Sequence, residues 1–268
     1  MRFWSFIALG AVAYASPQSK PAPSCGCSVA NVHVEHEGKP VGQMNEVNGI
    51  QTYISYPADK KTDYGILYLP DAFGFPLVQN RLLADSFAKA GYVVVGPDFF
   101  EGEPAPHDLA NPNFDYTAWL ARHPADKVDK IIENTIKYMK TTLGVKKIGA
   151  VGYCFGGRFV ARFLAKDKGL DAGFTAHPSL VTNEELQAVS GPFSIGAAEN
   201  DIIFTTPKRH EAEGILSKSN IPFQISLYGS TAHGFGVRGN MTNKREKYAK
   251  EEAYLQAVRW FDTWLKDI

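Results

Sequence analysis

The sequence has no surplus of charge, no long apolar run and no internal repeat, and these absences exclude several classes of protein. Its 28 basic residues balance 28 acidic ones without a basic block or stripe, so nothing in its charge favours nucleic-acid binding. The apolar run at residues 3–13 is too short to cross a hydrocarbon layer of roughly 30 Å as a helix. A chain of 268 residues can build one substantial core, so we expect one folded domain and no membrane partner.

The first residues have the features of a secretory signal peptide. Arg2 supplies a short positive start, the apolar run follows, and residues 13–15 give the small-x-small pattern that signal peptidase accepts. We expect a signal peptide at residues 1–15, a flexible segment at 16–37 and a domain at 38–268 of a secreted protein. The alternative is that residues 1–15 form a helix of the fold.

Cysteine is scarce, with three residues in the whole chain. Cys25 and Cys27 are separated by a single residue in the sequence. An oxidising compartment would close them into a strained small loop or leave them free, and C-x-C alone is a weak metal signal. Cys154 has no obvious partner. Such a leftover thiol is either buried and inert or reactive, and its sequence neighbours decide between the two.

Short apolar runs alternate with helical patterns along the rest of the chain, which predicts an α/β fold with a mainly parallel sheet and helices on both faces. Several runs are apolar throughout, as in strands covered on both sides. The expected strands are residues 51–56, 65–69, 92–95, 148–152, 172–176, 193–196 and 223–227. Residues 128–139 and 242–266 carry helical spacing, and residues 101–119 predict a loop or lid.

The strongest functional signal is the segment GYCFGG at residues 152–157. It is the G-x-S-x-G motif of α/β-hydrolases with cysteine in place of serine, between a strand and a helical pattern as the motif requires. Glycines are needed because two backbones approach closely at such a turn, and the helix N-terminus favours the reactive thiolate. The motif predicts that Cys154 is a nucleophile in an α/β-hydrolase fold. The alternative is a small core residue beside an ordinary turn.

A nucleophile needs a base, and in this fold the chain order is nucleophile, acid, histidine. Three histidines follow Cys154. His233 lies in a small-residue loop after a predicted strand, where open α/β sheets place their sites. His210 lies in a polar helical stretch, and His177 comes too early for the base and is instead a pocket candidate. His233 is therefore the expected base.

The remaining parts of an acyl-transfer site are an acid and an oxyanion hole. Asp201 comes just beyond a predicted strand and is expected to orient the histidine, with Glu199 as the alternative. The expected oxyanion donors are two backbone N–H groups, one of Phe155 beside the nucleophile and one of Ala72 in the loop after the strand at 65–69.

Five ordered segments resemble the dienelactone hydrolase (carboxymethylenebutenolidase) family, and in particular its secreted fungal branch. They are PDAFG at 70–74, GPDFF at 96–100, GYCFGG at 152–157, AEND at 198–201 and AHGF at 232–235. The resemblance runs from about residue 38 to the C-terminus. It implies a triad of Cys154, His233 and Asp201, a thioester intermediate, and hydrolysis of a small ester or lactone without metal or organic cofactor.

Two features depart from the family pattern. Family enzymes that open dienelactone have a glutamate that interacts with the resting cysteine, and here that position is Asp71, the expected support of the nucleophile loop. One arginine that binds the substrate carboxylate is replaced near residues 101–102, and a second survives as Arg238, one residue further from the histidine. Because one of the two arginines that would bind the substrate carboxylate is missing, we expect a bulkier, less charged substrate. Its pocket candidates, each of which also suits core packing, are Phe73, Phe99, Trp119, His177, Phe235 and Arg238.

The sequence therefore predicts a cysteine-dependent hydrolase that acts on a small molecule as a monomer or weak dimer. A non-catalytic binding protein on the same scaffold is the alternative. A thiol oxidoreductase that uses Cys25 and Cys27 is a weak option, because C-x-x-C spacing is absent. The sequon at residues 240–242 makes Asn240 a glycosylation candidate in a secreted chain.

Overall fold

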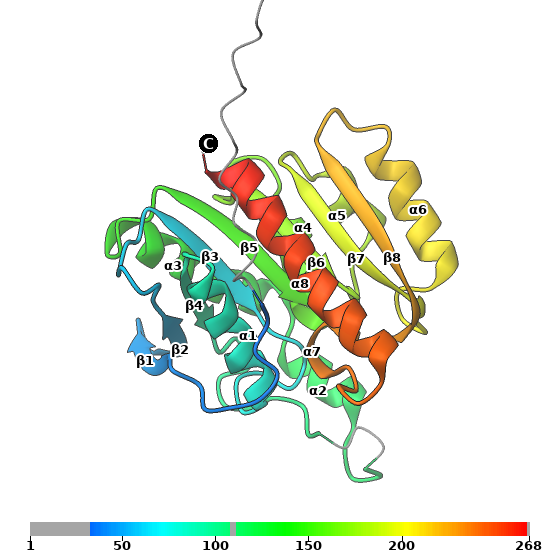
Figure 1. Ribbon diagram of the computed structural model, residues 1–268, viewed down its shortest axis with the longest axis horizontal. Coiled ribbons are helices and arrows are strands. Elements are labelled where there is room, and N and C mark those ends of the chain that lie inside the picture. Colours follow the sequence, from blue (N-terminus) through cyan, green and yellow to red (C-terminus); the bar gives the residue numbers. More distant parts are fainter. Residues whose placement is uncertain (1–32, 108–110, 267–268) are drawn as a thin grey trace, which may run out of the picture. The chain divides into compact units, whose positions relative to one another are not determined.

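The computed structural model describes residues 33–107 and 111–266, so the expectations for the signal peptide, Cys25 and Cys27 lie outside the described residues. Within these ranges, one eight-stranded sheet has the order β1-β2-β4-β3-β5-β6-β7-β8 (Figure 1). Both neighbours of β2 are antiparallel to it, and the other neighbouring strands pair in parallel. The strands are β1 Gln43–Val47, β2 Ile50–Ser55, β3 Tyr64–Leu69, β4 Val93–Pro97, β5 Lys147–Tyr153, β6 Ala172–Ala176, β7 Phe193–Asn200 and β8 Phe223–Ala232.

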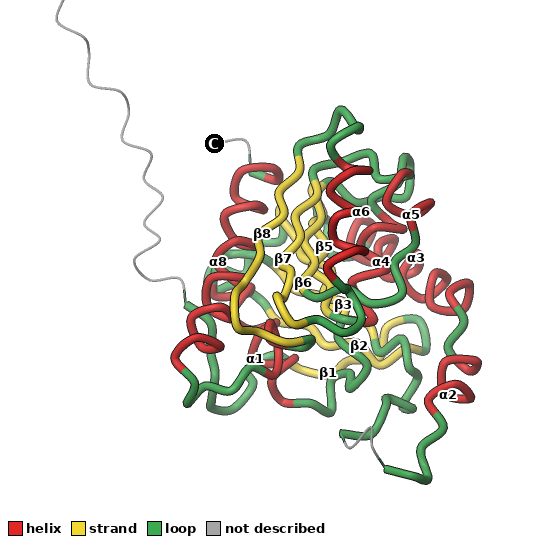
Figure 2. Tube along the Cα trace, turned by 90° about the vertical axis from the view of Figure 1, so that its right-hand side faces the viewer, coloured by secondary structure: helices red, strands yellow, loops and turns green. Residues whose placement is uncertain are grey.

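Helices cover both faces of this sheet, as Figure 2 shows with α1 and α8 on one side and α4 to α6 on the other. The helices are α1 Val78–Lys89, α2 Tyr116–Arg122, α3 Ala125–Thr141, α4 Phe155–Phe163, α5 Asn183–Gln187, α6 Thr206–Leu216, α7 Phe235–Arg238 and α8 Lys244–Leu265. This arrangement confirms the predicted α/β-hydrolase class. Among the described residues, no helix is both long enough and apolar enough to span a membrane.

The sequence pattern explains most of these elements. All seven predicted strands are present as β2 to β8, and the six inward residues expected on the helix at 128–139 are the buried residues of α3. The strand β1 was not predicted, because four of its five residues are exposed and it has no apolar run. It lies at one edge of the sheet, where a single antiparallel neighbour holds it.

Residues 34–36, just before the predicted domain boundary, contact the folded domain. Val34 is buried in the core, and the backbone N–H of Glu35 donates to Ser86 Oγ at 2.9 Å. His36 lies 2.9 Å from the Glu251 carboxylate of α8. One apolar side chain and these polar contacts thus attach the described end of the segment predicted as flexible to the domain.

Candidate active site

Cys154 lies on the tight turn between β5 and α4, as the motif predicts. Its backbone has φ 49° and ψ −112°, a region that non-glycine residues rarely adopt. The turn is held by backbone hydrogen bonds, from Cys154 N–H to the Ala176 carbonyl at 3.3 Å and from Gly156 N–H to the Pro70 carbonyl at 3.1 Å. The side chain is half-buried. The strained turn thus presents the sulfur at the carboxyl end of the central strand.

The glycines around Cys154 are required by close packing. A Cβ atom on Gly156 would lie 2.2 Å from the Leu69 carbonyl oxygen, and one on Gly152 would lie 2.6 Å from the Gly156 carbonyl oxygen. Real Cβ atoms do not approach backbone so closely. The end of β3 therefore sits directly against the start of α4, which brings the loop after β3 beside the nucleophile.

His233 and Asp201 lie together at the ends of β8 and β7. His233 Nδ1 is 2.9 Å from one Asp201 carboxylate oxygen and 3.0 Å from the other. Burial raises the pKa of Asp201, but the hydrogen bond and charge of His233 and two backbone N–H donors outweigh it, so the net shift is downward. These donors are Ile203 N–H at 2.8 Å and Phe204 N–H at 2.9 Å. The carboxylate is thus fixed in its ionised form.

The second nitrogen of His233 faces the nucleophile. Burial lowers the pKa of His233, but interactions with Asp201 and with the Cys154 sulfur outweigh it and raise the pKa to about 9. Nε2 is buried and has no hydrogen bond of standard geometry within the described residues. Catalytic hydrogen bonds are often long without substrate. The sequence-predicted Cys154, His233 and Asp201 are therefore brought together in one chain of contacts.

The two backbone amides expected to form the oxyanion hole have no acceptor among the hydrogen bonds of the described residues. Phe155 is the first residue of α4, and the first amides of a helix have no carbonyl to bind within it. In the loop after β3, the Ala72 carbonyl accepts from Ala105 N–H at 2.8 Å, whereas Ala72 N–H has no acceptor in the described part of the chain. The structure thus leaves both expected oxyanion donors available.

Comparison with known proteins identifies the family. The sequence model of the dienelactone hydrolase family matches residues 50–265. The chain belongs to this family. It is 43% identical to "Hydrolase pyvD" of Aspergillus violaceofuscus over 86% of this chain and 94% of that one. It is 44% identical to "Hydrolase tropI" of Talaromyces stipitatus over 87% of this chain and 94% of that one. The protein is a hydrolase of the dienelactone hydrolase family.

A solved structure shares the fold of this dienelactone hydrolase family member at low sequence identity. A thermophilic esterase from Thermogutta terrifontis matches with a TM-score of 0.61 and 17% identity, over 83% of this chain and 93% of that one. At this identity the likeness shows the fold alone.

Asp71 and Arg238 form one unit beside the site. Arg238 Nε donates to Asp71 Oδ2 at 3.1 Å, and its guanidinium lies 4.6 Å from the centre of the Phe73 ring. The other Asp71 oxygen accepts from Asn80 Nδ2 at 2.9 Å and from Phe73 N–H at 3.2 Å. Burial raises the pKa of Asp71, while Arg238, Asn80 and the Phe73 amide act against this shift. Asp71 thus orders the loop after β3, and its charge is paired with that of Arg238.

The other pocket candidates divide into two groups. His177 is fully buried, and its ring lies 5.0 Å from that of His233 and 5.5 Å from that of Phe235. Burial, followed by the charges of His233 and Arg238, holds the pKa of His177 well below its usual value. Phe99 and Trp119 have the placement of core residues, since both are buried and pack on the Phe155 ring.

Two residues near the sulfur were missed by sequence reasoning. Tyr116, at the start of α2, has its pKa raised by burial and by the nearby charge of Cys154. Its ring stacks on Trp119 at 5.6 Å. Ser179, in the loop after β6, places Oγ 3.7 Å from Cys154 Sγ. The Tyr116 and Trp119 pair lies in the expected loop or lid, but the sequence did not show which side chains point at the site.

The remaining candidates lie outside this cluster. His210 is exposed on α6, as predicted. Glu199, the alternative acid, accepts from Ser230 N–H at 2.6 Å and makes no hydrogen bond or ion pair with His233 within the described residues. Asn240 is exposed, and its side-chain oxygen accepts from Thr242 Oγ1 at 2.8 Å. Within the described ranges, no cluster of histidine, cysteine and acidic residues has the arrangement of a metal site.

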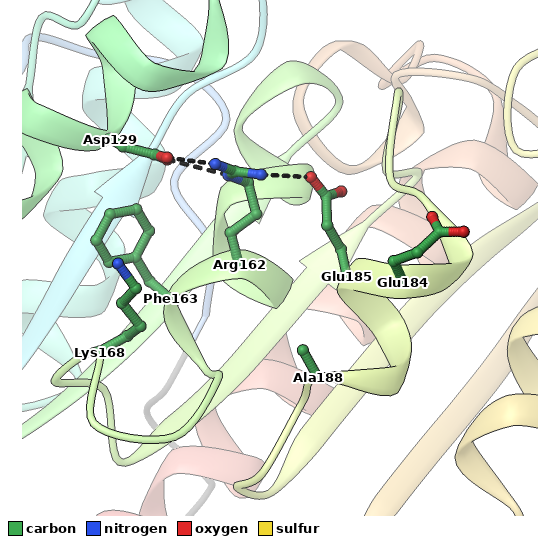
Figure 3. Close-up of a pocket in the computed structure, with 7 residues that line it drawn as sticks. All are labelled: Asp129, Arg162, Phe163, Lys168, Glu184, Glu185 and Ala188. Carbon is green, nitrogen blue, oxygen red and sulfur yellow. Dashed lines mark hydrogen bonds and ion pairs between the residues drawn. The ribbon is translucent and has the colours of Figure 1, made fainter.

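A charged surface pocket of about 260 Å³ lies near the far end of α4 (Figure 3). Arg162 pairs there with Asp129 of α3 and, at 2.8 Å, with Glu185 of α5. Glu185 also binds Arg158 at 2.8 Å. The carboxylates compensate the arginines, so the group fastens α4, which carries the nucleophile at its start, to its two neighbouring helices.

Proposed function

We propose that this hydrolase cleaves a small, neutral ester or lactone through a triad of Cys154, His233 and Asp201 with a thioester intermediate. The supporting observation is the position of His233, with Nδ1 2.9 Å from Asp201 and the opposite side of the ring against the Cys154 sulfur. An imidazole held between a carboxylate and a nucleophile on a strained strand-to-helix turn is the arrangement that acyl transfer needs.

Acylation begins with a proton on His233 and a negative charge on the sulfur. Cys154 Sγ attacks the carbonyl carbon, a C–S bond forms, and the carbonyl oxygen becomes an oxyanion. The N–H groups of Phe155 and Ala72 stabilise that oxygen, and loss of one such donor raises the barrier by about 3 kcal/mol. The C–O bond then breaks, and the leaving oxygen takes the proton from His233 Nε2.

Deacylation reverses the proton's direction. His233, now neutral, takes a proton from water, and the resulting hydroxide attacks the thioester carbonyl carbon. The C–S bond breaks, the acid leaves, and the sulfur and His233 return to their starting state. Asp201 holds the imidazole orientation through both halves of the reaction.

The charge balance beside the site favours a neutral substrate. Arg238 is the cation expected to bind a substrate carboxylate, but it is already paired with the buried carboxylate of Asp71 and lies over the Phe73 ring. A second carboxylate would have to compete with Asp71 for the same guanidinium. We therefore expect higher kcat/KM on uncharged esters than on matched esters that carry a carboxylate.

The decisive experiment compares the wild type with C154A over a panel of p-nitrophenyl esters and lactones. We expect hydrolysis by the wild type, loss of nearly all turnover in C154A, and inactivation of the wild type by iodoacetamide. The panel pairs p-nitrophenyl acetate with an ester of the same leaving group and an acidic acyl chain. Full activity of C154A would contradict the triad, and failure to hydrolyse any ester would favour the non-catalytic binding protein.

We further propose that the enzyme is secreted after removal of residues 1–15 and acts as a monomer or weak dimer without a metal or organic cofactor. The N-terminus supports secretion, since it has the short positive start, the apolar run and the cleavage pattern of a signal peptide. The sequon at Asn240 lies on an exposed loop, which a glycan requires.

A further inference from the structure

A buried hydroxyl lies against the candidate nucleophile. Ser179 is 3% exposed, and its Oγ is 3.7 Å from Cys154 Sγ, within hydrogen-bonding range for sulfur. Its backbone N–H donates to the Cys154 carbonyl at 2.9 Å. Within the described residues the sulfur is the one hydrogen-bond partner of this hydroxyl. Ser179 is thus attached to Cys154 through both its backbone and its side chain.

The backbone fixes the position of this hydroxyl. His177 and Leu180, on either side of Ser179, have φ 40° and φ 60°, which non-glycine residues rarely adopt. His177 N–H donates to the Gly196 carbonyl at 2.8 Å, which attaches the loop to β7. Surrounding structure must support such conformations. The loop therefore has one defined shape, and that shape directs Ser179 at the sulfur.

The charged and titratable groups around the sulfur leave a place for a neutral donor. His233 faces it from the end of β8, with Asp201 and the buried His177 behind that ring. Tyr116 of α2 is close enough for the charge of Cys154 to help raise its pKa, after the larger effect of burial. The Asp71 carboxylate is directed to Asn80, Phe73 N–H and Arg238 instead. A carboxylate beside a thiolate would repel it, whereas a hydroxyl can donate a hydrogen bond to it.

We propose that Ser179 donates its hydroxyl hydrogen to the Cys154 thiolate and so holds the nucleophile in its reactive form, opposite His233. The proton of the Cys154 thiol goes to His233 Nε2, and Ser179 keeps its own proton throughout. The hydroxyl acts on the resting enzyme, before substrate binds. This inference rests on the proposed role of Cys154 as the nucleophile.

The test is the pH dependence of iodoacetamide alkylation at Cys154, followed by peptide mass spectrometry so that Cys25 and Cys27 are counted separately. Hydrogen bonds to charged groups are among the stronger ones, so S179A should raise the pH of half-maximal alkylation by about one unit. Alkylation below that pH should become about tenfold slower. S179T, which keeps the hydroxyl, should resemble the wild type.

A second pair of variants distinguishes the effect of the hydroxyl on the alkylation profile from the effect of side-chain shape. S179T and S179V have the same shape and differ by one hydroxyl, so the same contrast is expected between them even where S179A folds poorly. Equal pH profiles for S179T and S179V, or a wild-type profile for S179A, would overturn the inference. Ester turnover by C154A would instead overturn the proposed function, since that result does not involve Ser179.

Discussion

At the scale of single residues, the contact between His233 and Asp201 sets the pH range in which the site is assembled. The pKa of His233 is raised to about 9, so the ring is protonated at neutral pH and can balance a thiolate at Cys154. A histidine with a raised pKa stabilises the fold fully below its unfolded value of about 6.5 and loses this effect as pH rises through about 9. Asp201, with a lowered pKa, stabilises the fold above its unfolded value and loses this effect at acid pH.

The variant D201N tests this assignment. It keeps the shape of the side chain but removes the charge that supports the imidazolium, so kcat/KM at pH 7 should fall by about 10²- to 10⁴-fold. In the wild type the kcat/KM profile should decline near pH 9, and in D201N that decline should move toward the ordinary histidine value. An unmoved alkaline limb would show that another group controls it. E199Q is the matched control and should leave the profile unchanged, since the one hydrogen bond of Glu199 within the described residues is to the Ser230 amide.

Several of these residue contacts could not be derived from sequence. The motif and chain order predicted Cys154, Asp201 and His233 as site residues, because each follows a strand with a readable apolar pattern. The pair of Asp71 and Arg238 joins residues 167 positions apart, and its geometry depends on how the sheet brings two loop ends together. Ser179 carries no pattern of its own. Only the shape of the loop after β6 places its hydroxyl at the sulfur.

At the scale of elements, the contact between β3 and α4 determines where the nucleophile stands. The variant G156A tests it, because the added Cβ would lie within 2.7 Å of backbone atoms of Leu69 and Pro70, closer than real Cβ contacts. Overpacking against backbone should lower the free energy of unfolding by about 3 kcal/mol and reduce activity. Urea denaturation and ester hydrolysis measure the two effects.

The matched control for that variant is G214A in α6. A Cβ at Gly214 meets nothing within 4 Å, and alanine favours a helix over glycine, so stability should rise by about 0.5–1 kcal/mol with unchanged activity. Equal stability of the two variants would show that the close approach at Gly156 is relieved by a shift of the chain.

The sequence predicted the helices and strands that have a clear apolar pattern, but it missed the exposed strand at the edge of the sheet and the short helix α2. The helix α3 and the buried strands have apolar patterns with a clear period, so their positions followed from the sequence. The exposed edge strand β1 has no such pattern and depends on its pairing with β2. The segment 101–119 was expected as a loop, but α2 begins within it, where Asp115 caps the helix by accepting from Ala118 N–H. That single cap was too weak a signal to predict the helix.

At the scale of the whole molecule, the fold class followed from the alternation of strands and helices, while the substrate depends on how distant loops meet. The loops after β3, β6, β7 and β8 converge on Cys154, which lies on the turn after β5. Each contributes one or two side chains, and no stretch of sequence holds more than a fraction of the site. The family is therefore easier to identify from sequence than the charge of the substrate, which depends on whether Asp71 occupies Arg238.

We also predict that the chain is secreted, which is tested separately from its catalytic activity. Expressed from its first codon in a eukaryotic secretory host, the protein should reach the medium with Ser16 at its N-terminus, because residues 1–15 have the pattern of a cleaved signal. A glycan at Asn240 should add mass that an N-glycosidase removes, since the side chain is exposed and its sequon threonine lies beside it. N240Q and T242A should both lose this added mass, whereas N243Q, an exposed asparagine outside a sequon, should keep it. Retention of the chain inside the cell with residues 1–15 intact would refute the signal, and a secreted chain with no mass shift would refute the glycan alone.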